Sequence, residues 1–156
     1  MGRRIGFVWL ATVLPFWTVP FYFFLGHGGF RSHLTFHIVY PFIIAAAVWA
    51  LWRLRQAAPG RAIRWLATIL IGLQLIAVVG HLGEGYVTAT NGGFHSPDSL
   101  FEDSTHEAFA NLALPALMLS QLLVIATTIV WAVQRRRTPP PTATRSPSEQ
   151  PAQQAR

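Results

Sequence analysis

Four long apolar stretches dominate the sequence and restrict the folds that are open to it. They run from about residue 5 to 25, 33 to 54, 63 to 82 and 107 to 133, and none has a charged residue in its middle. About 20 apolar helical residues are enough to cross the hydrocarbon core of a bilayer. Because backbone polar groups in lipid must bond within their own segment, we expect four membrane-spanning helices. The first stretch is too long for a typical signal peptide and lacks a small-residue cleavage pattern, so we expect it to be retained.

The composition agrees with a membrane protein and excludes several chemistries. Of the 156 residues, 52% are hydrophobic and 12% are charged, whereas a soluble domain carries roughly 25% charged residues. The sequence has no cysteine, which excludes disulfides, thiol nucleophiles and cysteine-ligated metal sites. All twelve basic residues are arginines, so lysine-based covalent catalysis is excluded as well.

The arginines predict the orientation of the helices. If the N-terminus is cytoplasmic, nine arginines flank the membrane on that side and only Arg31 lies near it on the outside. The nine are Arg3, Arg4, Arg53, Arg55, Arg61, Arg64, Arg135, Arg136 and Arg137. This distribution follows the positive-inside rule. We therefore expect an all-α, integral membrane four-helix bundle of up-down-up-down topology in the plasma membrane, with both termini cytoplasmic.

The chain divides into a membrane domain and a tail. Residues 1–137 hold the four apolar stretches, whereas residues 138–156 are rich in Pro, Ser, Thr and Gln. The tail has too few apolar residues to form a core, so we expect it to be disordered in the cytoplasm. The formal net charge of +6 comes from arginines at helix ends, which favour contact with lipid headgroups and not with nucleic acid.

Histidines and carboxylates gather on the predicted outer side. All six histidines map there, and several polar pairs have helical spacing, such as His33 with His37 and His81 with Glu84. Residues three or four apart share a helix face. Imidazole and carboxylate groups together suit zinc, iron, copper or manganese. The sequence therefore predicts a site for a divalent transition metal, with these candidate ligands: His33, His37, His81, Glu84, Asp103 and His106. Glu107 is a further carboxylate nearby.

A second form of site uses haem b. His37 and His81 lie on different predicted helices and can ligate one iron from opposite sides, while Arg31 pairs with a propionate. This arrangement resembles a reduced version of the four-helix, bis-histidine b-type cytochromes of membranes. The resemblance covers the architecture alone, since those families often carry histidine pairs on both sides of the membrane and this chain has none inside. It implies haem binding and electron transfer.

Two readings of the function stay open. In the first, the protein is a small polytopic membrane protein whose outer His/carboxylate cluster binds haem or a metal for electron transfer or metal handling. In the second, these side chains are ordinary helix ends, with Glu102 or Asp103 capping the fourth helix. The protein is then a non-catalytic scaffold or accessory subunit that contacts a membrane-protein partner or a second copy. The sequence has no HExxH motif, serine nucleophile elbow or phosphate-binding glycine motif, so no reaction is assigned.

Overall fold

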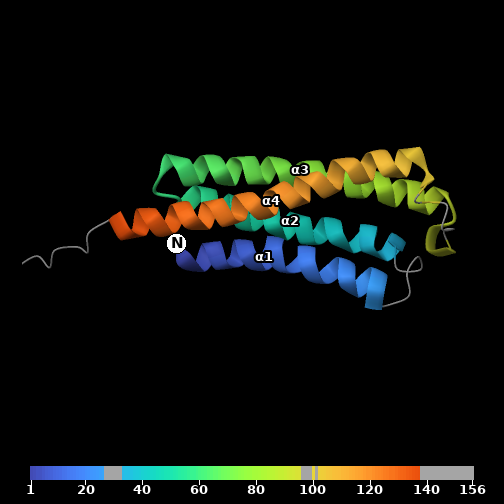
Figure 1. Ribbon diagram of the computed structural model, residues 1–156, viewed down its shortest axis with the longest axis horizontal. Coiled ribbons are helices and arrows are strands. Elements are labelled where there is room, and N and C mark those ends of the chain that lie inside the picture. Colours follow the sequence, from blue (N-terminus) through green and yellow to red (C-terminus); the bar gives the residue numbers. More distant parts are fainter. Residues whose placement is uncertain (27–32, 96–99, 101, 138–156) are drawn as a thin grey trace, which may run out of the picture.

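The described part of the chain is helical throughout. The computed structural model describes residues 1–26, 33–95, 100 and 102–137, and within them there is no strand. Figure 1 shows four long helices, which are α1 (Gly2–Pro20), α2 (His33–Ala57), α3 (Arg61–Thr90) and α4 (Ser104–Arg137). A π-helical segment η1 (Phe21–Gly26) continues α1, and a 3-10 turn η3 (Gly93–His95) follows α3. The all-helical class is thus confirmed, whereas the predicted tail at 138–156 lies outside the described residues.

All four helices are long and apolar enough to cross a membrane. Their outer surfaces carry large exposed apolar side chains, including Phe42, Trp17 and Leu122. Soluble monomers rarely expose broad apolar surfaces of this kind. The exposed surface therefore suits contact with lipid chains.

One end of the bundle, which we call the arginine end, is formed by Arg4, Arg53, Arg55, Arg61, Arg64 and Arg135 with the turn at 58–60. Here the Arg4 guanidinium donates a hydrogen bond of 2.9 Å to the Arg53 carbonyl, which holds the start of α1 against the end of α2. Leu51, Leu54 and Ile63 form the fully buried core behind it. The arginines themselves stay at the surface, and their planes lie over tryptophan rings, as Arg55 does over Trp52 at 5.4 Å.

At the other end, α3 and α4 pack closely through small residues. A Cβ added at Gly80 would lie 2.6 Å from the Ala113 Cβ, and one added at Gly83 would collide with the Phe109 ring. Small residues at a helix interface let two backbones approach in this way. Helix α3 continues past Leu82, where its apolar run ends, and reaches Thr90. Glu84, whose spacing from His81 predicted a shared helix face, lies on this extension.

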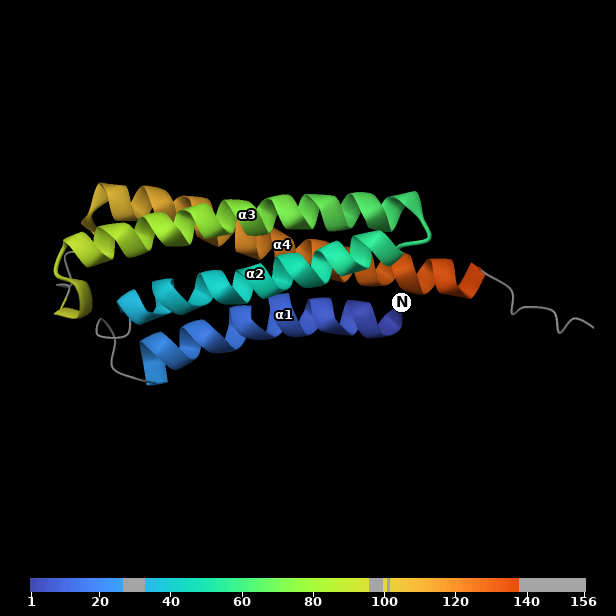
Figure 2. The same cartoon turned by 180° about the vertical axis from the view of Figure 1, so that it is seen from behind.

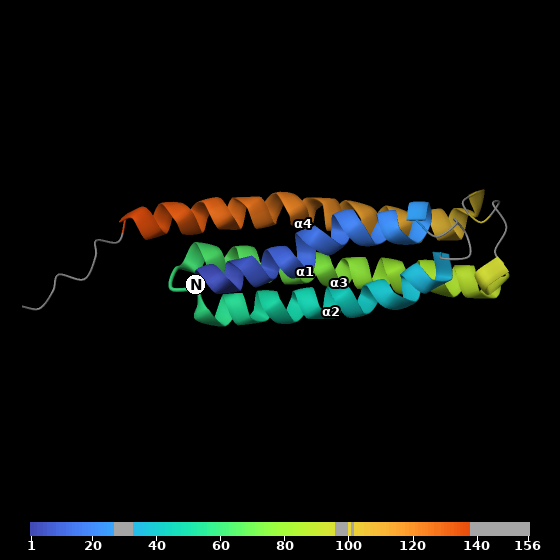
Figure 3. The ribbon, with the colours of Figure 1, turned by 90° about the horizontal axis from the view of Figure 1, so that it is seen from below.

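The fourth helix changes neighbours along its length. At the arginine end it lies beside α1, where the Trp9 indole donates a 2.9 Å hydrogen bond to the Thr128 hydroxyl. Toward the other end it moves away from α1 and runs beside α3 (Figures 1 and 2). Figure 3 shows α2 and α4 on opposite sides of the bundle. The candidate site lies in this part of the bundle, beside a cavity that is lined by residues of α1, α2, α3 and α4.

Candidate metal centre

Five ionisable side chains from three helices meet at the end of the bundle opposite the arginines. We call them the histidine cluster, and they are His33, His37, His81, Glu84 and His106. His33 and His37 lie one turn apart at the start of α2, His81 and Glu84 lie one turn apart on α3, and His106 lies in the first turn of α4. Each is at most 7% exposed. Buried ionisable groups are rare unless they are paired or bind a metal.

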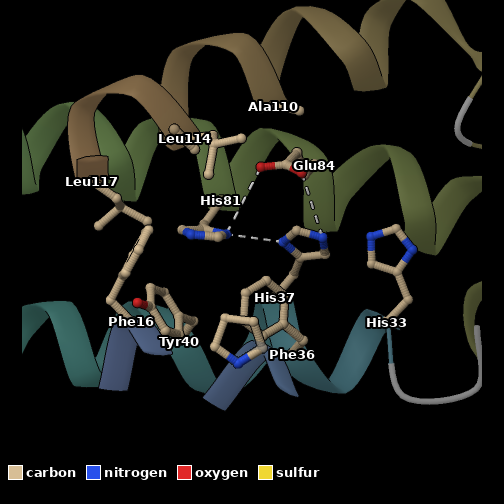
Figure 4. A pocket seen from close by; sticks show the side chains of 12 residues that line it. Phe16, His33, Phe36, His37, Tyr40, His81, Glu84, Ala110, Leu114 and Leu117 are labelled. Carbon is tan, nitrogen blue, oxygen red and sulfur yellow. Dashed lines mark hydrogen bonds and ion pairs between the residues drawn. The ribbon is translucent and has the colours of Figure 1, made fainter. Parts of the chain in front are cut away.

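The Glu84 carboxylate lies at the centre of the histidine cluster. Its Oε2 atom is 3.7 Å from His37 Nε2 and 3.8 Å from His106 Nε2. Its Oε1 atom is 3.8 Å from His81 Nδ1. One carboxylate thus faces imidazoles from all three helices, and Figure 4 shows its two oxygens turned toward His81 and His37.

The imidazoles also contact one another in pairs. His33 Nε2 lies 3.3 Å from His106 Nε2, and His37 Nδ1 lies 3.1 Å from His81 Nδ1. A neutral imidazole has one ring nitrogen that donates and one that accepts. In the His37–His81 pair, therefore, one ring donates to the other, and the His37 Nε2 atom is left facing Glu84.

The spacing of four of these groups fits a single ion. One donor atom each from His33, His37, Glu84 and His106 can be chosen so that all lie within 4.8 Å of one another. Around a tetrahedral zinc ion, with bonds of about 2.0–2.1 Å, ligand atoms lie about 3.3–3.4 Å apart. The 3.3 Å between His33 and His106 already matches this separation, and the 3.7–3.8 Å contacts of Glu84 need only a small closure.

Local structure holds these side chains in place. The Asp103 carboxylate accepts hydrogen bonds from the backbone N–H groups of Thr105 and His106, at 2.8 and 3.0 Å. It thereby caps the N-terminus of α4 and fixes the turn that carries His106. These backbone bonds hold the pKa of Asp103 below its ordinary value of 3.8. Gly85 leaves room for His37, since a Cβ there would lie 3.1 Å from the His37 Cβ.

An apolar cavity of about 230 Å³ adjoins the cluster. Its apolar walls come from α1, α2 and α4 and include Phe16, Pro20, Phe36, Tyr40, Leu114 and Leu117. Its polar end is formed by four members of the cluster, namely His33, His37, His81 and Glu84. Figure 4 shows His37 and His81 between the carboxylate of Glu84 and the rings of Phe36 and Tyr40. Leu114 at the edge is 53% exposed, so the cavity opens toward the outer surface of the bundle between α1 and α4.

The structure brings together five of the six candidate metal ligands and separates the sixth. Asp103 lies outside the cluster and acts as a helix cap, as the alternative reading of this residue expected. Glu107 and His95 are exposed. Arg31, the expected haem partner, lies outside the described residues, as does His27.

Two features of the site were not anticipated from the sequence. Tyr40 lines the cavity, and its spacing from His33 and His37 along one helix face is the signal that points to it. Gly80 and Gly83 create the close α3–α4 contact that brings His106 to Glu84. Small residues are enriched at helix interfaces in membranes, so two glycines one turn apart in an apolar helix indicate a close contact without naming its partner.

Comparison of the chain with protein-family models, with curated protein sequences and with solved structures finds no match in any of the three. The geometry and chemistry of the cluster and its cavity are therefore the evidence for its function.

Proposed function

We propose that this protein is a small multi-pass membrane protein that binds one divalent transition metal ion in the histidine cluster, with zinc and ferrous iron as the leading candidates. His33, His37, His106 and Glu84 are the proposed ligands. The observation that carries the proposal is the burial of four ligand-type side chains from three helices with donor atoms within 4.8 Å. Three imidazoles and a carboxylate form a donor set that these metals accept.

The cost of burial supports a bound ion. Imidazoles and a carboxylate lose their hydration when they are enclosed by apolar helices, and that loss must be offset by bonds within the site. The His37 Nε2 atom is buried and has no hydrogen-bond partner among the described residues. A metal ion would bond to this nitrogen and to the Glu84 oxygen 3.7 Å away.

The geometry favours an ion over haem b. Axial histidines of a haem lie on opposite faces of the macrocycle, with the iron between their nitrogens. His37 and His81 instead contact each other directly, with Nδ1 atoms 3.1 Å apart and ring centroids 5.3 Å apart. A macrocycle between them would require α2 and α3 to separate. For this reason we assign His81 to the support of His37 and not to axial ligation.

Metal content tests the proposal. The detergent-purified protein is incubated with zinc, dialysed and measured by elemental analysis, with His37→Gln as the test variant and His95→Gln as the matched control. We expect about one zinc per chain in the unchanged protein and in the His95 variant, and a loss of most of it in the His37 variant. Absence of stoichiometric zinc or iron from all three proteins would contradict the proposal and favour the cofactor-free scaffold.

We further infer that the four helices cross the plasma membrane in an up-down-up-down arrangement with both termini cytoplasmic. Support comes from the arginines, since Arg4, Arg53 and Arg135 share the end of the bundle opposite the histidine cluster. Arg53 lies over Trp49 and Arg135 over Trp131, which is typical of interfacial anchors.

Reporter fusions test this orientation. A reporter fused after Arg137 should be active only in the cytoplasm, and one inserted after Asn91 only outside. The reverse pattern would place the histidine cluster on the cytoplasmic side and contradict the inferred orientation.

A further inference from the structure

One ring nitrogen in the cluster points away from the proposed ion and into the apolar cavity. His81 Nδ1 faces His37 and Glu84, whereas His81 Nε2 is buried and has no hydrogen-bond partner among the described residues. Figure 4 shows the second nitrogen on the side of Phe16 and Leu117. His81 is only 4% exposed, so water at the protein surface does not satisfy this nitrogen.

The metal fixes which nitrogen of His81 carries hydrogen. With an ion on His37 Nε2, the hydrogen of His37 lies on Nδ1, from which it is donated to His81 Nδ1 at 3.1 Å. A neutral His81 then carries its own hydrogen on Nε2. Ligating histidines regularly donate their second N–H to a neighbouring group in this way. The cavity therefore presents one N–H donor within an otherwise apolar lining.

We propose that this cavity binds the head of a single-chain amphiphile from the bilayer, namely a carboxylate of the fatty-acid type, and that His81 Nε2–H donates to its head group. The inference rests on the proposed metal centre. A divalent ion with one carboxylate ligand leaves a net positive charge, and an anionic oxygen nearby offsets that charge in a medium of low dielectric constant. The remaining walls are apolar, which suits a hydrocarbon chain.

The size and position of the cavity agree with this ligand. A cavity of about 150 Å³ is large enough to bind benzene, and this one is about 230 Å³. It holds the head and the first carbons of a chain, while the remainder extends past Leu114 into the lipid. Entry from the side needs no passage through water, because the opening lies between α1 and α4 where apolar side chains face the bilayer.

Equilibrium binding of radiolabelled decanoate to the zinc-loaded protein in phosphatidylcholine nanodiscs tests the proposal. We expect saturable binding near one decanoate per chain above empty nanodiscs. Leu114→Trp, which narrows the opening, and His81→Phe, which removes the donor, should each weaken binding at least tenfold. Leu122→Trp adds the same bulk to an exposed position of α4 that does not line the cavity, and it should leave binding unchanged.

Two further comparisons separate this inference from the metal centre. Decanol has the same chain without the charge and should compete at least tenfold less well than decanoate. Removal of zinc by a chelator should weaken decanoate binding at least fivefold. Failure of the protein to take up zinc would contradict the metal centre directly. Normal zinc uptake without saturable decanoate binding, equal competition by decanol, or equal loss in the Leu122 variant would overturn the inference about the cavity alone.

Discussion

Both ends of the bundle carry ionisable side chains, which are exposed at one end and buried at the other. At the arginine end the charged groups stay at the surface, and their aliphatic stems and guanidinium planes rest on tryptophan rings, as with Arg53 over Trp49 at 5.8 Å. In the histidine cluster the ionisable groups are enclosed, and Glu84 faces three imidazoles at 3.7–3.8 Å. The core behind the arginines is apolar, whereas the core at the other end includes buried ionisable side chains.

This difference indicates where the function lies. Exposed arginines keep their hydration and cost the fold little, so the proposed contact with a membrane surface would be enough to explain their positions. Buried imidazoles and a carboxylate destabilise a small bundle unless something offsets their dehydration. Helix packing alone therefore does not explain why the groups of the histidine cluster are buried, whereas the proposed metal ion would explain it.

The largest expected difference in zinc affinity is between a variant that removes a charge in the histidine cluster and one that removes a charge at the arginine end. Glu84→Gln keeps the shape of the side chain but removes the central negative charge, and it should lower zinc affinity by at least about 100-fold. It should also reduce the rise in the unfolding midpoint that zinc produces. Zinc competition with a chromogenic chelator measures the affinity.

Two control variants test whether the loss of zinc affinity is specific to Glu84. Arg64→Gln changes an exposed charge at the arginine end, and Glu107→Gln changes an exposed carboxylate in the same turn as His106. Both should change zinc affinity by less than about threefold, because exposed charges several ångströms away are screened by solvent. Equal losses in Glu84→Gln and Glu107→Gln would mean that the carboxylate does not act as a ligand.

The next effect comes from the helix contact that assembles the cluster. Gly80→Ala places a Cβ 2.6 Å from the Ala113 Cβ, which forces α3 and α4 apart and should cost about 1–3 kcal/mol of stability. Zinc affinity should fall about tenfold as His106 moves away from Glu84. Gly72→Ala is the matched control on the same helix, since nothing lies within 4 Å of its added Cβ, and it should be neutral or stabilising by up to about 1 kcal/mol.

Thermal unfolding in one detergent, with and without zinc, measures both glycine variants. If Gly72→Ala lowered the unfolding midpoint as much as Gly80→Ala, the close α3–α4 contact would not be the cause.

The smallest effect concerns the cap of α4. Because backbone hydrogen bonds hold the pKa of Asp103 below its ordinary value of 3.8, the ionised cap stabilises the helix start above that pH and loses its effect as the pH falls through the lower value in the folded protein. The protection of the Thr105 and His106 amide hydrogens, taken relative to their intrinsic exchange rate at each pH, should therefore fall in acid. Asp103→Asn should remove this pH dependence but leave zinc affinity within threefold. A loss of zinc binding in this variant would indicate that Asp103 is a metal ligand.

The sequence predicts the helices well because bilayer thickness restricts how an apolar stretch can fold. It also identifies His33 and His37 as one face of a helix, since that relation is local. It does not show that His106 from the last helix reaches Glu84, because this contact depends on the approach of α3 and α4 at Gly80 and Gly83. The role of Asp103 likewise depends on the three-dimensional arrangement, since a carboxylate that precedes a helix can act equally well as a metal ligand or as a helix cap.

X-ray absorption spectroscopy of the zinc-loaded protein at the zinc edge tests the proposed metal centre most directly. A four-coordinate shell of nitrogen and oxygen at about 2.0–2.1 Å, with the outer-shell scattering of three imidazoles, is the expected result, and the small amount of zinc that His37→Gln retains should show one imidazole fewer. A shell without imidazole scattering, or one that is identical in the His37 variant, would contradict a metal centre at the histidine cluster.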